Sequence, residues 1–107
     1  MNIKDLVTAA GMNAYRKGQI KRQSYSKSLK DYYNHMKSEL KEVKKAEKPW
    51  SGVNVTMTAY NPDSFESEIA DLIIRTASYC HLMGIDLDKA IIEKLAYNET
   101  RKEGKEY

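Results

Sequence analysis

Four acidic side chains in this 107-residue sequence stand in two pairs with helical spacing. Glu39 and Glu42 are three residues apart, and so are Glu68 and Asp71. Residues three apart project from one side of an α-helix in successive turns, so each pair offers two carboxylates to one ligand. Four acids without a counter-charge would repel one another, whereas Mg²⁺ prefers hard oxygen ligands. The pattern therefore predicts one site for Mg²⁺, or for Mn²⁺, provided that the two pairs meet; a single pair is also common on the solvated face of a helix.

Two helices are predicted before and around the first pair. One covers about residues 3–17, with Asn2 as N-cap and Gly18 as its stop. The other runs from residue 29 to about residue 46, behind a capping box formed by Ser28 and Asp31. Its apolar residues follow a 4-3-4-3 rhythm that requires packing along one seam: Leu29, Tyr33, Met36, Leu40 and Val43.

The first acidic pair flanks this seam. With a rotation of about 100° per residue around the helix axis, Glu39 and Glu42 lie about 80° and 140° from the centre of the apolar seam. The carboxylates are therefore expected at the edge of a helix interface, where the second pair can reach them.

Two more helices are predicted after a break in the pattern. The third follows a capping box formed by Asp63 and Glu66 and ends at Gly84. Its broad apolar face consists of Phe65, Ile69, Leu72, Ile73, Thr76, Ala77, Cys80 and Met83. The fourth begins behind Asp86 as N-cap, with inward positions at Leu87, Ala90, Ile91 and Leu95.

The segment between residues 48 and 62 has a different pattern. Pro49 and Gly52 break the helix, and apolar and polar residues then alternate as in an extended strand. We expect a long loop with one short strand. Trp50 and Tyr60 bracket this loop and could stack on a base or pack over the core.

The composition favours a single all-α domain over residues 1–107 with a frayed tail over 101–107. Only two prolines and five glycines interrupt the chain, and 18 Lys and Arg against 15 Asp and Glu give a mild positive charge. A lone cysteine, Cys80, excludes an intramolecular disulfide and is expected in the core. With no apolar stretch near the roughly 18 residues that span a bilayer and no signal-peptide pattern, a soluble cytoplasmic protein is expected.

The acidic pairs and the residues after them resemble the MazG-like nucleotide pyrophosphohydrolases, also called all-α NTP pyrophosphohydrolases. The signature of that family, ExxE followed by ExxD, is present here as E-L-K-E at 39–42 and E-I-A-D at 68–71, with 25 residues between Glu42 and Glu68. The likeness continues with G-I-D-L at 84–87 and K-L-A-Y-N-E-T-R at 94–101, and N-A-Y-R-K-G at 13–18 resembles the end of the family's first helix. Gln19 stands where the family commonly has an aromatic residue.

The resemblance implies a four-to-five-helix MazG-like bundle completed by oligomerisation, as a homodimer or a dimer of dimers. It also implies Mg²⁺-dependent hydrolysis of a (d)NTP to (d)NMP and diphosphate. Glu39, Glu42, Glu68 and Asp71 would then be both the metal ligands and the catalytic residues. One of them would act as general base, and Glu42 is favoured because it lies furthest round the helix from the seam.

Lys94, Asn98 and Arg101 are spaced by four and three residues, so the fourth helix presents them in one row. The resemblance favours phosphate binding for this row over the alternative of a solvated helix end. Arg75, one turn after Asp71, could pair with that carboxylate or reach a phosphate, and the ion pair is favoured. His35 is expected to be structural and is left out of the site.

A different class of function is a non-catalytic helical module that binds nucleotides or nucleic acid and has a regulatory role. It is suggested by cations around the first interhelical loop, with Tyr25 among them: Lys17, Lys21, Arg22, Lys27 and Lys30. A family member that binds nucleotides without turnover is a third possibility. The broad apolar face of the third helix leaves more hydrophobic surface than a monomer readily covers, which also favours a homo-oligomer.

Overall fold

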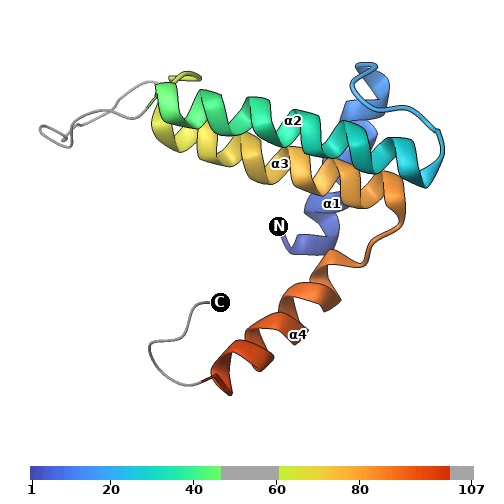
Figure 1. Cartoon of the computed structure of the whole chain (residues 1–107), viewed down its shortest axis with the longest axis vertical. Helices are drawn as coiled ribbons and strands as arrows, with labels where there is room; N and C mark the ends of the chain where they lie inside the picture. Colours follow the sequence, from blue (N-terminus) through green and yellow to red (C-terminus); the bar gives the residue numbers. More distant parts are fainter. Residues whose placement is uncertain (47–60, 102–107) are drawn as a thin grey trace, which may run out of the picture.

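Four α-helices make up the described part of the chain, which in this computed structural model comprises residues 1–46 and 61–101. They are α1 (Ile3–Arg16), α2 (Tyr25–Lys45), α3 (Phe65–Met83) and α4 (Leu87–Glu99). α2 and α3 lie antiparallel and side by side, α1 packs mainly on α3, and α4 leaves from the C-terminal end of α3 (Figure 1). The all-α prediction is confirmed for these residues. The strand predicted within 48–62, Trp50, Tyr60 and most of the predicted tail lie outside them.

The ends of α1 and α4 follow the predicted capping signals. The side chain of Asn2 accepts a hydrogen bond from the amide of Asp5 at 2.8 Å, and that of Asp86 accepts one from the amide of Lys89 at 3.1 Å. After α1 and α3 the chain turns at Gly18 and Gly84, whose φ angles of 71° and 70° lie in the left-handed region that favours glycine. The predicted stops are therefore correct.

The predicted starts of α2 and α3 are wrong. Ser24, not Ser28, caps α2 and accepts a hydrogen bond from the amide of Lys27 at 3.1 Å. Ser28 is buried inside the helix. Ser64, not Asp63, caps α3 and accepts from the amide of Ser67 at 3.1 Å. Both errors have one cause, since two capping-type residues stand close together and local sequence alone does not choose between them.

Small residues bring α1 close to α3. Ala10, Gly11 and Ala14 are the buried residues of α1, and a Cβ atom added to Gly11 would overlap the side chain of His81 on α3. The hydroxyl of the buried Ser78 donates to the carbonyl of Ala10 at 3.2 Å and so joins the two helices. The contact depends on close approach of the two backbones.

The core cluster lies where α1, the α1–α2 loop and α3 meet. Ala14, Ile20 and Tyr79 form its buried centre, and Tyr32, Leu82 and Met83 pack against it. Cys80 is also buried, as predicted. Burial of apolar surface here supplies the main driving force for holding the first three helices together.

Polar side chains join α2 to α3. The hydroxyl of Tyr32 lies 3.2 Å from that of Thr76, and the hydroxyl of Tyr79 lies 2.7 Å from Nδ1 of His35. Tyr79 is only 2% exposed, and burial raises its pKa, so its hydroxyl stays protonated. His35 thus has a structural partner, as expected from the sequence.

α4 is the least buried helix. None of its residues is buried, and its tertiary contacts are mainly with α1. The predicted inward position of Leu95 is wrong, because this side chain is 61% exposed, and Ala90 is exposed too. Leu87 and Ile91 are half-buried. Across residues 1–46 and 61–101, no helix has both the length and the apolar character that crossing a bilayer requires.

Candidate metal centre

Three of the four acids predicted to form a site come together between α2 and α3. Glu39 of α2 and Glu68 and Asp71 of α3 each offer a carboxylate oxygen, and these oxygens all lie within 4.8 Å of one another. The antiparallel pairing sets the last turns of α2 beside the first turns of α3, and the spacing of three residues turns Glu68 and Asp71 to one side. We call Glu39, Glu68 and Asp71 the carboxylate triad.

The face of α2 that carries Glu39 is the face covered by α3. Ser28, His35, Glu39 and Ala46 follow one another at helical intervals of seven, four and seven residues, and each is buried or half-buried. The predicted apolar seam takes part in this contact only along one edge: Met36 lies 3.5 Å from the hydroxyl of Thr76, whereas Tyr33 and Leu40 are 59% and 57% exposed. The acids therefore lie inside the α2–α3 contact.

Glu68 is the buried member of the triad. Only 8% of the residue's surface is exposed, and its carboxylate accepts no hydrogen bond from residues 1–46 or 61–101. Its oxygens are not among the fully buried atoms that lack a partner in this part of the chain, so solvent still reaches them. Burial raises the pKa of Glu68, and the charges of Asp71, Glu42 and Glu39 raise it further. A cation would supply the missing counter-charge.

The donor set suits a hard divalent cation. Carboxylate oxygens from three side chains, with Asp71 open to solvent, leave room for water or phosphate oxygens around an ion such as Mg²⁺. The triad could therefore hold a metal ion. Exposed acids often cluster without one, so the more telling observation is Glu68, which is 8% exposed and lies among acids that raise its pKa.

Glu42 lies outside the triad. It is exposed on α2, one turn after Glu39, yet close enough to Glu68 for its charge to contribute to the raised pKa of that carboxyl. The predicted four-ligand set thus separates into three convergent carboxylates and one at the rim. The rotation of α2 that turns Glu39 toward α3 carries Glu42 about 60° further round.

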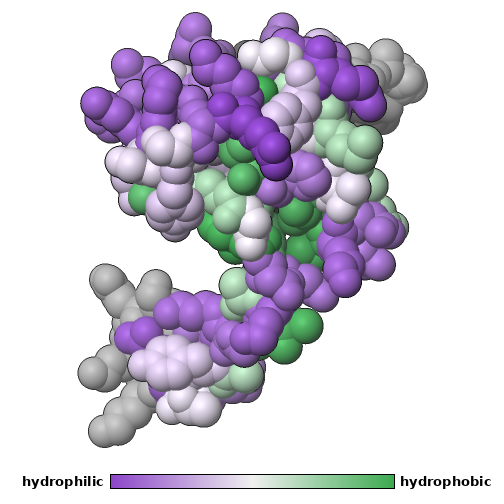
Figure 2. Space-filling view, turned by 90° about the vertical axis from the view of Figure 1, so that its right-hand side faces the viewer, coloured by the Kyte–Doolittle hydropathy of each residue, from purple (hydrophilic) through white to green (hydrophobic). Residues whose placement is uncertain are grey.

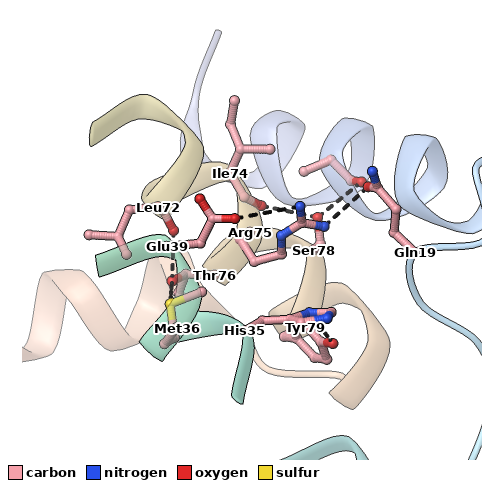
Figure 3. A network of polar contacts seen from close by, with 11 residues as sticks. Gln19, His35, Met36, Glu39, Leu72, Ile74, Arg75, Thr76, Ser78 and Tyr79 are labelled. Atoms are coloured by element: carbon pink, nitrogen blue, oxygen red, sulfur yellow. Dashed lines mark hydrogen bonds and ion pairs between the residues drawn. The ribbon is translucent and has the colours of Figure 1, made fainter. Parts of the chain in front are cut away.

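Arg75 has a different partner from the predicted one. Its Nη2 atom lies 3.7 Å from Oε1 of Glu39 on α2, and its Nη1 atom donates to Oε1 of Gln19 at 3.2 Å (Figure 3). The predicted pair with Asp71 is replaced by this cross-helix pair. The sequence placed Arg75 near the site but gave no signal for Gln19, which lies 56 residues earlier.

The predicted phosphate-binding row lies on α4 and just beyond its end, away from the triad. Lys94 and Asn98 are on the helix, whereas Arg101 follows the C-cap Thr100. Both Lys94 and Arg101 lie over the ring of Tyr97, at 5.2 and 5.7 Å from its centroid. Asp71 and the end of α3 are separated by 12 residues, or about 18 Å of helix, and α4 then diverges from α2 and α3 (Figure 1). Within one chain this row does not adjoin the carboxylates.

The end of the molecule around the α1–α2 loop is hydrophilic. Figure 2 looks onto this end, and hydrophilic residues dominate its upper part. The five cations noted in the sequence, Lys17, Lys21, Arg22, Lys27 and Lys30, are all exposed. They lie at the opposite end of α2 from Glu39, so a nucleic-acid surface there would be separate from the triad.

A shallow pocket of about 210 Å³ lies elsewhere, between α1 and the α3–α4 turn. Lys4, Val7, His81 and Leu87 are among its lining residues. No member of the triad lines it. We place the candidate chemistry at the triad, because the pocket brings together no comparable set of ligand atoms.

The chain matches no protein-family model, no curated protein and no solved structure. The likeness to the MazG-like enzymes therefore rests on the motif residues and their spacing.

Glu68→Gln should stabilise the metal-free protein near neutral pH. The native state raises the pKa of Glu68 above its ordinary value of 4.5, so the stability linked to this carboxyl is complete below that value and is lost as the pH rises through the native pKa. Glutamine does not ionise, so the variant does not lose this stability as the pH rises. Thermal unfolding with a chelator should show a higher Tm for the variant at about pH 7 and nearly equal values at about pH 4. Glu66→Gln, at an exposed acid of the same helix, serves as control, and a Glu68→Gln variant less stable than wild type at neutral pH would contradict the prediction.

Proposed function

We propose that this chain is a Mg²⁺-dependent nucleoside triphosphate pyrophosphohydrolase that converts a (d)NTP and water to (d)NMP and diphosphate. The observation that carries the proposal is the convergence of Glu39, Glu68 and Asp71, with Glu68 buried and without a hydrogen-bond partner in the described part of the chain. The ExxE and ExxD spacing adds the reaction class by resemblance.

The triad would hold the cation through one carboxylate from α2 and two from α3. Mg²⁺, when bound, supplies charge neutralisation for phosphate oxygens and lowers the pKa of water. Phosphoryl-transfer catalysis depends mainly on positioning and on charge stabilisation, which a site built on two packed helices can provide. The partly buried setting strengthens these electrostatic interactions relative to bulk water.

Glu42 suits the role of general base. It is exposed at the rim of the triad, where its carboxylate can accept a proton from a water molecule and pass it to solvent. It is not among the three convergent ligands, so it is free for this role. Glu42→Gln is therefore expected to lower turnover more than it lowers metal affinity.

We also propose that the protein works as a homodimer through the outer face of α2 and α3. Exposed apolar side chains are present on both helices: Tyr33 and Leu40 on α2, and Phe65 and Ile73 on α3. In a monomer they remain in contact with water. A second copy offers the same face, as isologous contacts in two-fold dimers require. Lys94, Asn98 and Arg101 can then contribute to phosphate binding from the partner's α4.

Light scattering at micromolar concentration should report a dimer or a dimer of dimers. Leu40→Glu should shift the population toward monomer, because it places a charge in the apolar contact. Asn34→Glu adds the same charge on an exposed part of α2 away from this stripe and should leave the mass unchanged. A wild-type monomer under these conditions would refute the dimer.

A nucleotide panel tests the reaction. Ribo- and deoxyribonucleoside triphosphates are incubated with the purified protein and Mg²⁺ or Mn²⁺, and released diphosphate is measured. At least one nucleotide should yield diphosphate in a metal-dependent manner. Nucleotide binding by calorimetry without diphosphate release would favour a binding module, and salt-sensitive nucleic-acid binding that is unchanged by Glu39→Gln would favour the basic surface as the functional one.

A further inference from the structure

Arg75 is a cation that the structure places beside the carboxylate triad. Its guanidinium lies between Glu39 on α2 and Gln19 in the α1–α2 loop (Figure 3). The side chains of Arg75 and Glu39 are 22% and 14% exposed, so their interaction is screened less by salt than a surface pair would be.

The geometry of this pair is loose. At 3.7 Å, the separation of Nη2 from Oε1 of Glu39 exceeds the roughly 2.7–2.9 Å of a charge-assisted hydrogen bond. The contact of Nη1 with the neutral Gln19, at 3.2 Å, is the closer one. Arg75 is therefore anchored at the rim of the site and only partly committed to Glu39.

A divalent cation and Arg75 compete for the same carboxylate. Glu39 is a triad member, so an ion held by the triad comes within a few ångströms of the guanidinium and is repelled by it. The competition resolves if Arg75 releases Glu39 when the ion binds. Gln19 then still holds the guanidinium near the rim.

A released guanidinium suits an anionic ligand. Its planar fork of N–H donors matches phosphate oxygens, which a metal held by the triad would bring to the same place. The two positive groups are then neutralised by one polyphosphate. Arg75 would pass from a protein carboxylate to the ligand.

We propose that Arg75 is a built-in counter-ion of the triad that occupies Glu39 before a cation binds and contacts the phosphates of the substrate afterwards. The second half rests on the proposed function, whereas the first half concerns the metal alone. The proposal predicts opposite effects of one substitution on two ligands, which a purely structural role of Arg75 would not produce.

The experiment measures Mn²⁺ binding by electron paramagnetic resonance and then binding of inorganic triphosphate to the Mn²⁺-loaded protein by calorimetry. Arg75→Met should bind Mn²⁺ about tenfold more tightly than wild type, because a competing charge is removed. The same variant should bind triphosphate about tenfold more weakly, because a donor is lost. Inorganic triphosphate makes the second measurement independent of the preferred base.

Two further variants serve as controls. Lys89→Met removes an equal charge from the exposed Lys89–Glu93 pair on α4 and should change neither affinity more than about twofold. Arg75→Lys keeps the charge but loses the planar fork, so Mn²⁺ affinity should stay near the wild-type value while triphosphate binding weakens. This variant also tests the proposal if Arg75→Met does not fold, which circular dichroism would reveal.

The outcomes distinguish this proposal from the proposed function. Unchanged or weaker Mn²⁺ binding by the Arg75→Met variant would overturn the proposal that Arg75 is a counter-ion of the triad. A wild-type protein that binds no Mn²⁺ would overturn it too. Tighter Mn²⁺ binding together with weaker triphosphate binding supports it. If that pattern appears while no nucleotide in the panel releases diphosphate, the pyrophosphohydrolase proposal fails, but the proposed counter-ion role of Arg75 stands.

Discussion

Replacing Asp71 with asparagine should lower metal-dependent diphosphate release by at least about 100-fold and leave the fold intact. Asparagine keeps the size of the side chain but removes the negative charge that holds a hard cation. The loss corresponds to about 3 kcal/mol of transition-state stabilisation, a usual cost of removing one group that stabilises developing charge. Asp71 is exposed, so no buried partner is left unsatisfied by the change.

Two measurements make the Asp71→Asn result specific. Mg²⁺ or Mn²⁺ should raise the Tm of the wild-type protein by mass action and should do so much less for the variant. Glu66→Gln removes a charge from an exposed position of the same helix that is outside the triad and should retain full activity. An Asp71→Asn protein with near wild-type turnover would show that the triad is not the catalytic metal site.

Gly11→Ala should destabilise the protein by about 1 kcal/mol, although alanine in place of glycine usually stabilises a helix. Alanine favours helices over glycine by about 1 kcal/mol. At this position the new Cβ would overlap His81 close to the backbone of α3, where the ring cannot simply swing away. Overpacking of this kind typically costs about 1–3 kcal/mol and should move α1 away from α3.

His81 provides the internal test of the Gly11 prediction. In a double-mutant cycle, Gly11→Ala should cost much less stability in a His81→Gly background than in the wild-type protein, because His81→Gly removes both the ring and the Cβ atom that the new methyl group would overlap. Thermal or urea unfolding gives the four values. Additive effects would show that the His81 contact is not what excludes a larger residue at position 11.

Local signals in the sequence were sufficient for most of the helix ends. Asn2 and Asp86 cap their helices through contacts three residues away, and Gly18 and Gly84 end theirs through backbone conformation. Such contacts depend only on neighbours in the sequence. The same locality produced the error at α2, where Ser24 and Ser28 were both plausible caps.

The convergence of the triad was predictable from spacing, but the arrangement of its surroundings was not. Periodicity shows where apolar side chains gather on α2 and so predicts the packing seam. The contact with α3 includes the seam residue Met36, but it also uses groups that periodicity counts as polar, such as Tyr32 with Thr76 and His35 with Tyr79. The choice of Glu39 as the partner of Arg75 likewise depends on how two helices dock, which spacing within one helix cannot reveal.

The proposed dimer through the exposed apolar stripe of α2, formed by Tyr33 and Leu40, would make the candidate site depend on protein concentration. The α2–α3 contact that assembles the triad includes several polar groups, and the exposed side chains of Tyr33 and Leu40 add hydrophobic stabilisation only if the proposed second copy covers them. When folding and association are linked, dilution shifts both equilibria together. Specific activity, which dilution leaves unchanged in a non-dissociating protein, should then fall on dilution, so that assays at nanomolar and at micromolar concentrations of the chain give different values.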